Sequence, residues 1–185
     1  MGLFTGARLE ELGQLRSDNI RQADYVDGDG NDAKAWIIAI ESRDEVGHVV
    51  KTEDSERLVP IHAELIRLGF LGYASASESN EGRRLFPDLK PNIYGTLTAK
   101  WGEWYSQYRR EVCLLTDRRL VFHSFRHTFK DIARHVGIPQ GVQRQIMGHS
   151  PGDVPEEYGE GQSLHQLVLG MQTYRIPGLT IPSRS

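Results

Sequence analysis

The stretch from residue 124 to residue 147 constrains the fold more than any other part of this 185-residue chain. In its first half, apolar side chains recur every three or four residues, at Phe125, Phe129, Ile132 and Val136. This spacing predicts an amphipathic helix over 124–136, which Gly137 and Pro139 would end. A shorter helix is predicted over about 140–147. Helices with one apolar face must pack against other elements, so the stretch indicates a folded core.

The rest of the chain divides into further helices and a block of strands. Helical spacing also occurs over four other ranges, 7–16, 62–70, 96–111 and 163–174, with Thr5 as the expected N-cap of the first. Three short apolar or alternating runs, 35–41, 46–51 and 57–62, predict three or four antiparallel strands between residues 20 and 62. Residues 74–95 are rich in Ser, Gly, Pro and Asn and are predicted to be an exposed loop. The expected fold class is α+β, mostly helical, with one small antiparallel sheet.

Composition narrows the class of protein. Hydrophobic residues make up 38% of the chain and charged residues 25%, with a mean hydropathy of −0.47. No apolar run approaches the roughly 20 residues that a transmembrane helix needs, so a soluble, cytoplasmic protein without a membrane partner is expected. The single cysteine, Cys113, excludes an internal disulfide framework and a cysteine-based zinc site.

Charge is distributed unevenly along the chain. The net charge of −3 argues against an indiscriminate nucleic-acid binder, yet residues 100–149 carry nine basic and four acidic residues. Residues 1–99 carry eleven basic and seventeen acidic residues. The basic block also holds four of the seven histidines and predicts a positive surface for an anionic partner. The alternative is chance clustering on solvated helices.

Several polar residues stand where they favour anion chemistry. His123 and Arg126 are three residues apart at the start of the predicted 124–136 helix, where an anion is already favoured. Arg8 lies at a predicted helix start, although with Glu11 it also fits an ordinary surface salt bridge.

Lys51 and the pair His123 and His127 could also have functional roles, but each has a simple structural alternative. Lys51 lies at the tip of a predicted hairpin, where a lysine also discourages edge pairing. His123 and His127 have the spacing of a metal pair, but no nearby carboxylate completes a zincin signature, so no metal is expected.

Taken in order, these residues resemble the catalytic domain of the tyrosine recombinase (phage integrase) family. The elements are Thr5-Gly6-Ala7-Arg8 followed by Glu11, Lys51 nine residues before Pro60, His123-x-x-Arg126-His127, Gly148-His149-Ser150 and Tyr158. Each element alone is weak, whereas five in the family's order and spacing are specific. The resemblance covers about residues 3–160, and the tail after Tyr174 resembles the ends of some phage-type integrases.

The resemblance implies a reaction on a DNA phosphodiester. Arg8 and Arg126 would bind the two non-bridging oxygens and stabilise the charge that grows in the transition state. Tyr158 would attack phosphorus and form a 3′-phosphotyrosine intermediate, and a second 5′-hydroxyl would rejoin the strands. The bond energy is kept in the covalent link, so no ATP, metal or other cofactor is expected.

The remaining site residues receive supporting roles by the same resemblance. Lys51 would protonate the leaving 5′-oxygen. His123 and His149 would hydrogen-bond the phosphate or manage the tyrosine proton, and Glu11 would orient neighbouring basic groups.

The resemblance also implies partners and domain organisation. The expected partner is double-stranded DNA. The protein is expected to be a monomer in isolation and a dimer or tetramer on DNA. A bacterial phage or other mobile element is expected to encode it. Residues 1–185 are expected to be an N-terminally truncated catalytic domain that lacks the family's N-terminal DNA-binding domain. Residues 163–185 would form its C-terminal helix and tail.

Three other functions remain open at this stage. Residues 125–147 also resemble a helix-turn-helix, which fits a non-catalytic DNA-binding module. That interpretation leaves Arg8, Lys51 and Tyr158 without a role. A type IB topoisomerase-like nicking and closing enzyme would share the same chemistry, and a metal-dependent hydrolase built on the histidines is the third alternative.

Overall fold

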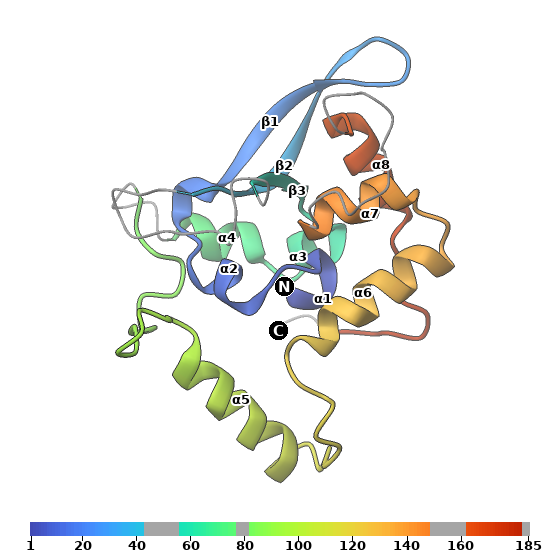
Figure 1. Cartoon of the computed structure of the whole chain (residues 1–185). Helices are drawn as coiled ribbons and strands as arrows, with labels where there is room; N and C mark the ends of the chain where they lie inside the picture. The colour runs from blue at the N-terminus through green and yellow to red at the C-terminus, as the bar shows by residue number, and fades with distance from the viewer. Residues whose placement is uncertain (43–55, 77–81, 149–161, 183–185) are drawn as a thin grey trace.

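A three-stranded sheet surrounded by helices makes up the part of the chain that the computed structural model describes, residues 1–42, 56–76, 82–148 and 162–182 (Figure 1). The helices are α1 (Gly2–Thr5), α2 (Leu9–Gly13), the 3₁₀ turn η1 (Ser17–Asn19), α3 (Ala63–Arg67), α4 (Phe70–Ser75), α5 (Ala99–Glu111), α6 (Ser124–His135), α7 (Gln140–Met147) and α8 (Leu164–Thr173). The strands are β1 (Ile20–Val26), β2 (Asp32–Ile40) and β3 (Arg57–Pro60). The predicted α+β class, mostly helical with one small antiparallel sheet, is confirmed.

The sheet is antiparallel, in the order β1-β2-β3. The middle strand, β2, pairs Ile38 with Ile20 of β1 and with Val59 of β3. Its second half is buried, whereas the β1–β2 hairpin projects from the top of the view in Figure 1. The strand predicted over 46–51 lies outside the described residues.

The helix predicted over 7–16 is confirmed only as the shorter α2, and Thr5 is not its N-cap. Thr5 ends α1, and the chain then turns through Gly6, which has a φ of 61°. A Cβ at Gly6 would lie 2.8 Å from the Phe129 ring, so both the backbone angle and the space favour glycine. The helix resumes at α2, with Arg8 at the N-cap and the Glu11 carboxylate accepting from the Arg8 N–H at 2.7 Å.

The long loop and the 62–70 helix also need correction. Gly69, with a φ of 82°, separates α3 from α4, and α4 extends into the range predicted to be loop. Left-handed backbone at a glycine ends one helix without steric cost, so a second helix can start in a new direction.

The buried face of α6 is rotated from the predicted one. Arg126, Phe129 and Ala133 are its buried residues, and Phe125, Ile132 and Val136 are only half-buried. The helical spacing of Trp101, Trp104 and Tyr108 predicts that Trp104 faces the core. This prediction is wrong, because the Trp104 side chain on α5 is 52% exposed. Helical spacing gives the face, but the packing partners decide how far it turns towards the core.

The C-terminal helix and the residues after it pack against the core of the structure. Helix α8 packs on α7 and β3 of the same chain, close enough that a Cβ at Gly170 would lie 2.7 Å from Val142 Cγ1. After α8, the fully buried Tyr174 stacks on Phe129 and donates from its hydroxyl to the Leu3 carbonyl at 3.0 Å. The two ends of the described chain are thereby tied together.

His62 is expected to make stability depend on pH. Its Nδ1 accepts from the Glu64 N–H at 3.0 Å, and its Nε2 is 3.0 Å from the Tyr174 carbonyl oxygen. The ring hydrogen is therefore assigned to Nε2, which donates to that oxygen. Burial lowers the pKa of His62 below its ordinary value of 6.5. The unfolded state therefore binds more protons as the pH falls below about 6.5, and the free energy of unfolding decreases.

Urea unfolding between pH 7.5 and 5.5 measures this effect. We expect His62→Gln to have a shallower loss of stability on acidification than the native chain, and His135→Gln, at an exposed position, to keep the native slope. An unchanged slope in His62→Gln would contradict the assignment.

No described helix has the length and apolar character needed to cross a membrane.

Candidate active site

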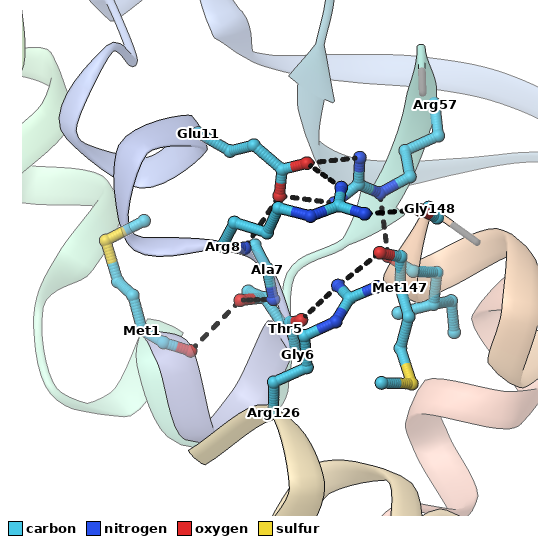
Figure 2. Close-up of polar contacts among 11 residues, drawn as sticks. Met1, Thr5, Gly6, Ala7, Arg8, Glu11, Arg57, Arg126, Met147 and Gly148 are labelled. Carbon is cyan, nitrogen blue, oxygen red and sulfur yellow. Dashed lines mark hydrogen bonds and ion pairs between the residues drawn. The ribbon is translucent and has the colours of Figure 1, made fainter. Parts of the chain in front are cut away.

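Glu11 lies at the centre of a group of charged side chains (Figure 2). Its Oε1 accepts from Arg8 Nη1 at 2.7 Å, and its Oε2 accepts from Arg57 Nη2 at 2.9 Å. Burial alone would raise the pKa of Glu11, but hydrogen bonds to Arg57, its positive charge and hydrogen bonds to Arg8 lower it overall. The carboxylate is therefore ionised at neutral pH and holds two guanidiniums in fixed positions.

Arg57 is the site residue that the sequence did not reveal. Its side chain is 2% exposed, and its Nε donates to the Ile146 carbonyl at 2.9 Å. It is the first residue of β3, so the pattern of apolar residues around it predicted only a strand. The one available signal is a charged residue opening an apolar run, which is also common at exposed strand ends.

Arg126 is buried between two segments that are far apart in the sequence. Its Nη1 donates to the Gly6 carbonyl at 2.7 Å and also to the Met147 carbonyl. Its Nη2 is buried and has no acceptor among the described residues. Burial, with the nearby charge of Arg8, lowers the pKa of Arg126 to about 10, so it stays protonated at neutral pH.

The three arginines meet at the C-terminal end of α7. Their acceptors are three consecutive main-chain carbonyls, those of Ile146, Met147 and Gly148. Arg57 comes from β3, Arg126 from α6 and Arg8 from the start of α2. The Nη2 of Arg8 donates to the Gly148 carbonyl at 3.4 Å. The end of a helix carries free carbonyls and partial negative charge, so it is a suitable anchor for cations.

Gly148 makes this arrangement sterically possible. It ends α7 with a φ of 64°, and a Cβ there would lie 2.4 Å from Arg57 Nη1. Glycine is therefore required both by the backbone angle and by the approach of the arginine.

His123 lies at the N-cap of α6, and its ring is 5.1 Å from that of His127. Burial, followed by the charges of His127, Arg126 and Arg8, lowers the pKa of His123 below 6.5. The imidazole is therefore neutral at pH 7 and can accept a proton.

The structure brings four of the predicted site residues into this region. They are Arg8, Glu11, His123 and Arg126, with Arg57 added. Lys51, His149 and Tyr158 lie outside the described residues. Within the described part, three guanidiniums lie near one carboxylate, and two of them contact it, so the net positive charge favours an anionic ligand. The same part contains no group of three or more His, Cys, Asp or Glu residues arranged to hold a metal ion.

Comparison with known proteins gives one sequence relative and several structural neighbours. No family model matches the chain. It is 26% identical over 156 residues to the prophage integrase IntF of Escherichia coli K12, covering 84% of this chain and 28% of that protein. The Tn1549 transposon integrase in complex with transposon right end DNA aligns with a TM-score of 0.51 at 17% identity. That alignment covers 95% of this chain and 52% of the integrase.

A second structure of the same integrase, with circular intermediate DNA, gives a TM-score of 0.48 at 19% identity, over 95% of this chain and 53% of that one. The chain thus spans about a quarter of the length of the prophage integrase and about half of the Tn1549 integrase chain in both structures.

The chain shares its fold with about half of the Tn1549 transposon integrase chain. The sequence relative is a prophage integrase, so the resemblance to the tyrosine recombinase family is confirmed.

Proposed function

We propose that this chain is the catalytic domain of a site-specific tyrosine recombinase that acts on duplex DNA. The observation that carries the proposal is the set of arginines at the end of α7. Arg126 presents a buried Nη2 that lacks an acceptor in the described structure, beside the neutral His123. An unsatisfied buried donor costs about 1–3 kcal/mol, and a phosphate oxygen would satisfy it.

The arginines supply electrostatic stabilisation in the proposed reaction. A phosphodiester repels nucleophiles because it is negatively charged, and its charge grows further on the non-bridging oxygens in the transition state. Arg8 and Arg126 would each donate to one of these oxygens. Glu11 and the α7 carbonyls hold the guanidiniums in place beforehand, so little reorganisation is needed during the reaction.

The proposed proton transfers involve Tyr158, a histidine and Lys51. A tyrosine phenol ordinarily has a pKa of about 10, so a base must take the proton of Tyr158 as the oxygen attacks phosphorus. A neutral His123 or His149 fits that role. The bond from phosphorus to the 5′-oxygen breaks, and Lys51 gives that oxygen a proton. A 5′-hydroxyl from another strand then reverses the steps and releases the tyrosine.

The same proposal includes the domain organisation and the partners. Residues 1–185 would form the catalytic domain, with 163–185 as its C-terminal helix and tail. The partner would be double-stranded DNA, bound by a dimer or tetramer that assembles from monomers.

A nicked suicide duplex carrying the junction sequence of the encoding element tests the proposal. We expect a covalent protein–DNA adduct on a denaturing gel, equal in amount with and without EDTA. Tyr158→Phe, which removes one oxygen, is the matched control and should give none. A native protein that binds the duplex but never forms the adduct would instead support the non-catalytic DNA-binding module. Relaxation of supercoiled plasmids without strand exchange would support the topoisomerase-like alternative.

A further inference from the structure

A polar pocket is lined by residues of α6, α7 and the turn between them. This corner of the chain lies towards the right edge of Figure 1. It has a volume of about 460 Å³. The residues that line it are Lys130, Arg134, Gly137, Ile138, Gln140, Gln143, Arg144 and Met147. Three of them are cations, two carry amide groups and none is acidic, so the lining favours an anion.

The cations of α6 extend a polar face that begins at the candidate active site. Residues 123, 127, 130 and 134 are separated by four, three and four positions, which places them on one side of the helix. The first two are histidines, and the last two are Lys130 and Arg134. Neither of these two cations forms an ion pair with a described residue. Their charge is therefore not cancelled within the described structure.

The corner is held in a defined shape. The buried Gln143 donates from Nε2 to the Ile138 carbonyl at 2.6 Å, across the turn that joins the two helices. Gly137 ends α6 with a φ of 79°. The pocket is therefore formed by the turn itself rather than by loosely packed side chains.

The pocket and the candidate active site share a wall. Met147 lines the pocket, and its carbonyl accepts from Arg126 Nη1. Arg134 is eight residues beyond Arg126 on α6, which corresponds to about 12 Å along the helix. Neighbouring phosphates of one strand are separated by only a few ångströms along the duplex axis, so both positions are close enough to contact one DNA backbone.

We propose that this pocket binds a backbone phosphate of the same DNA strand, a few nucleotides from the phosphate held by Arg8 and Arg126. Lys130, Arg134 and Arg144 supply the positive charge, and the Gln140 amide is placed to donate to a phosphate oxygen. The contact carries no base information, so it fixes the position of the duplex rather than its sequence. This inference rests on the proposed function.

The double variant Lys130→Gln/Arg134→Gln tests the pocket. Binding of the full chain to a fluorescent duplex is measured by anisotropy between 50 and 200 mM KCl. The slope of log K against log [KCl] should become shallower by about 1–2, because each phosphate contact contributes about 0.9. At 0.1 M salt the affinity should fall roughly ten- to a hundredfold, since each contact contributes a factor of about 8 at that concentration.

The matched control is Lys100→Gln/Arg110→Gln, which removes the same charge from exposed positions on α5. The control should retain the native slope and affinity. An equal loss in both variants would overturn the proposal, because the effect would then be one of overall charge. Thermal unfolding of both variants verifies that the fold is retained.

Two further outcomes separate the possible failures. If the native chain binds the duplex and the pocket variant keeps its slope, the pocket inference fails and the proposed function stands. If the native chain binds no duplex, both fail.

Inorganic phosphate distinguishes a free anion from DNA. Its binding is followed through the side-chain amide resonances of Gln140 and Gln143. Saturation by micromolar phosphate, together with an unchanged DNA slope, would mark a site for a free anion and overturn the assignment.

Discussion

Replacing Arg126 with lysine or glutamine is expected to slow adduct formation by about 10²–10³. Lysine keeps the positive charge but has no planar fork, so it cannot donate to the Gly6 and Met147 carbonyls and to a phosphate oxygen together. Glutamine removes the charge as well and should be the slower of the two. Because the loss is one of transition-state stabilisation, DNA affinity should change by less than about tenfold.

Single-turnover adduct formation on the suicide duplex gives the rate. Arg109→Lys is the matched control, because Arg109 is also buried and donates from Nη1 to two carbonyls, those of Leu115 and Asp117. It lies on α5, away from the site. If Arg109→Lys slowed the reaction as much as Arg126→Lys, the effect would come from a damaged fold, and the role assigned to Arg126 would be wrong.

Glu11→Gln is expected to destabilise the domain by about 3–5 kcal/mol. The substitution removes the charge that compensates Arg57, whose side chain is 2% exposed and cannot turn to solvent. The corresponding fall in Tm for a chain of this size is about 10 °C. The matched control is Glu64→Gln, because the Glu64–Arg67 pair is exposed to solvent and should contribute little to stability.

Urea unfolding at pH 7 measures both variants. Removing both charges, as in Glu11→Leu/Arg57→Met, should recover part of the stability, because a buried apolar pair needs no counter-charge. An equally small cost for Glu11→Gln and Glu64→Gln would show that Arg57 finds compensation elsewhere.

Local patterns predicted much of the fold, and the failures have identifiable causes. The apolar spacing of α7 and α8 gave their bounds to within a residue or two, since those helices bury one regular face. The helix predicted over 7–16 starts later than expected, at Leu9, because the left-handed turn at Gly6 precedes it and Glu11 accepts from the Arg8 N–H at its start. Periodicity does not register this local event. The face of α6 was misplaced because Arg126 is buried, which hydrophobic patterning excludes by construction.

The candidate site likewise contains residues that the sequence predicted and residues that it did not. Arg8, Glu11, His123 and Arg126 belong to short motifs, and the structure brings them to one region. Arg57 was missed because its partner Glu11 is 46 residues away, and no spacing rule extends that far.

The carbonyls of α7 were missed for a different reason. Main-chain oxygens are present at every residue, so the sequence does not distinguish those that a fold will use as acceptors.

The meeting of three arginines at one helix end has a consequence for when the proposed reaction could occur. Each guanidinium is supplied by a different part of the chain, and the oxygens that receive them lie together at the C-terminal end of α7. An incompletely folded molecule therefore lacks the cluster of three arginines. Under the proposed function, strand cleavage would require that these distant segments have already come together.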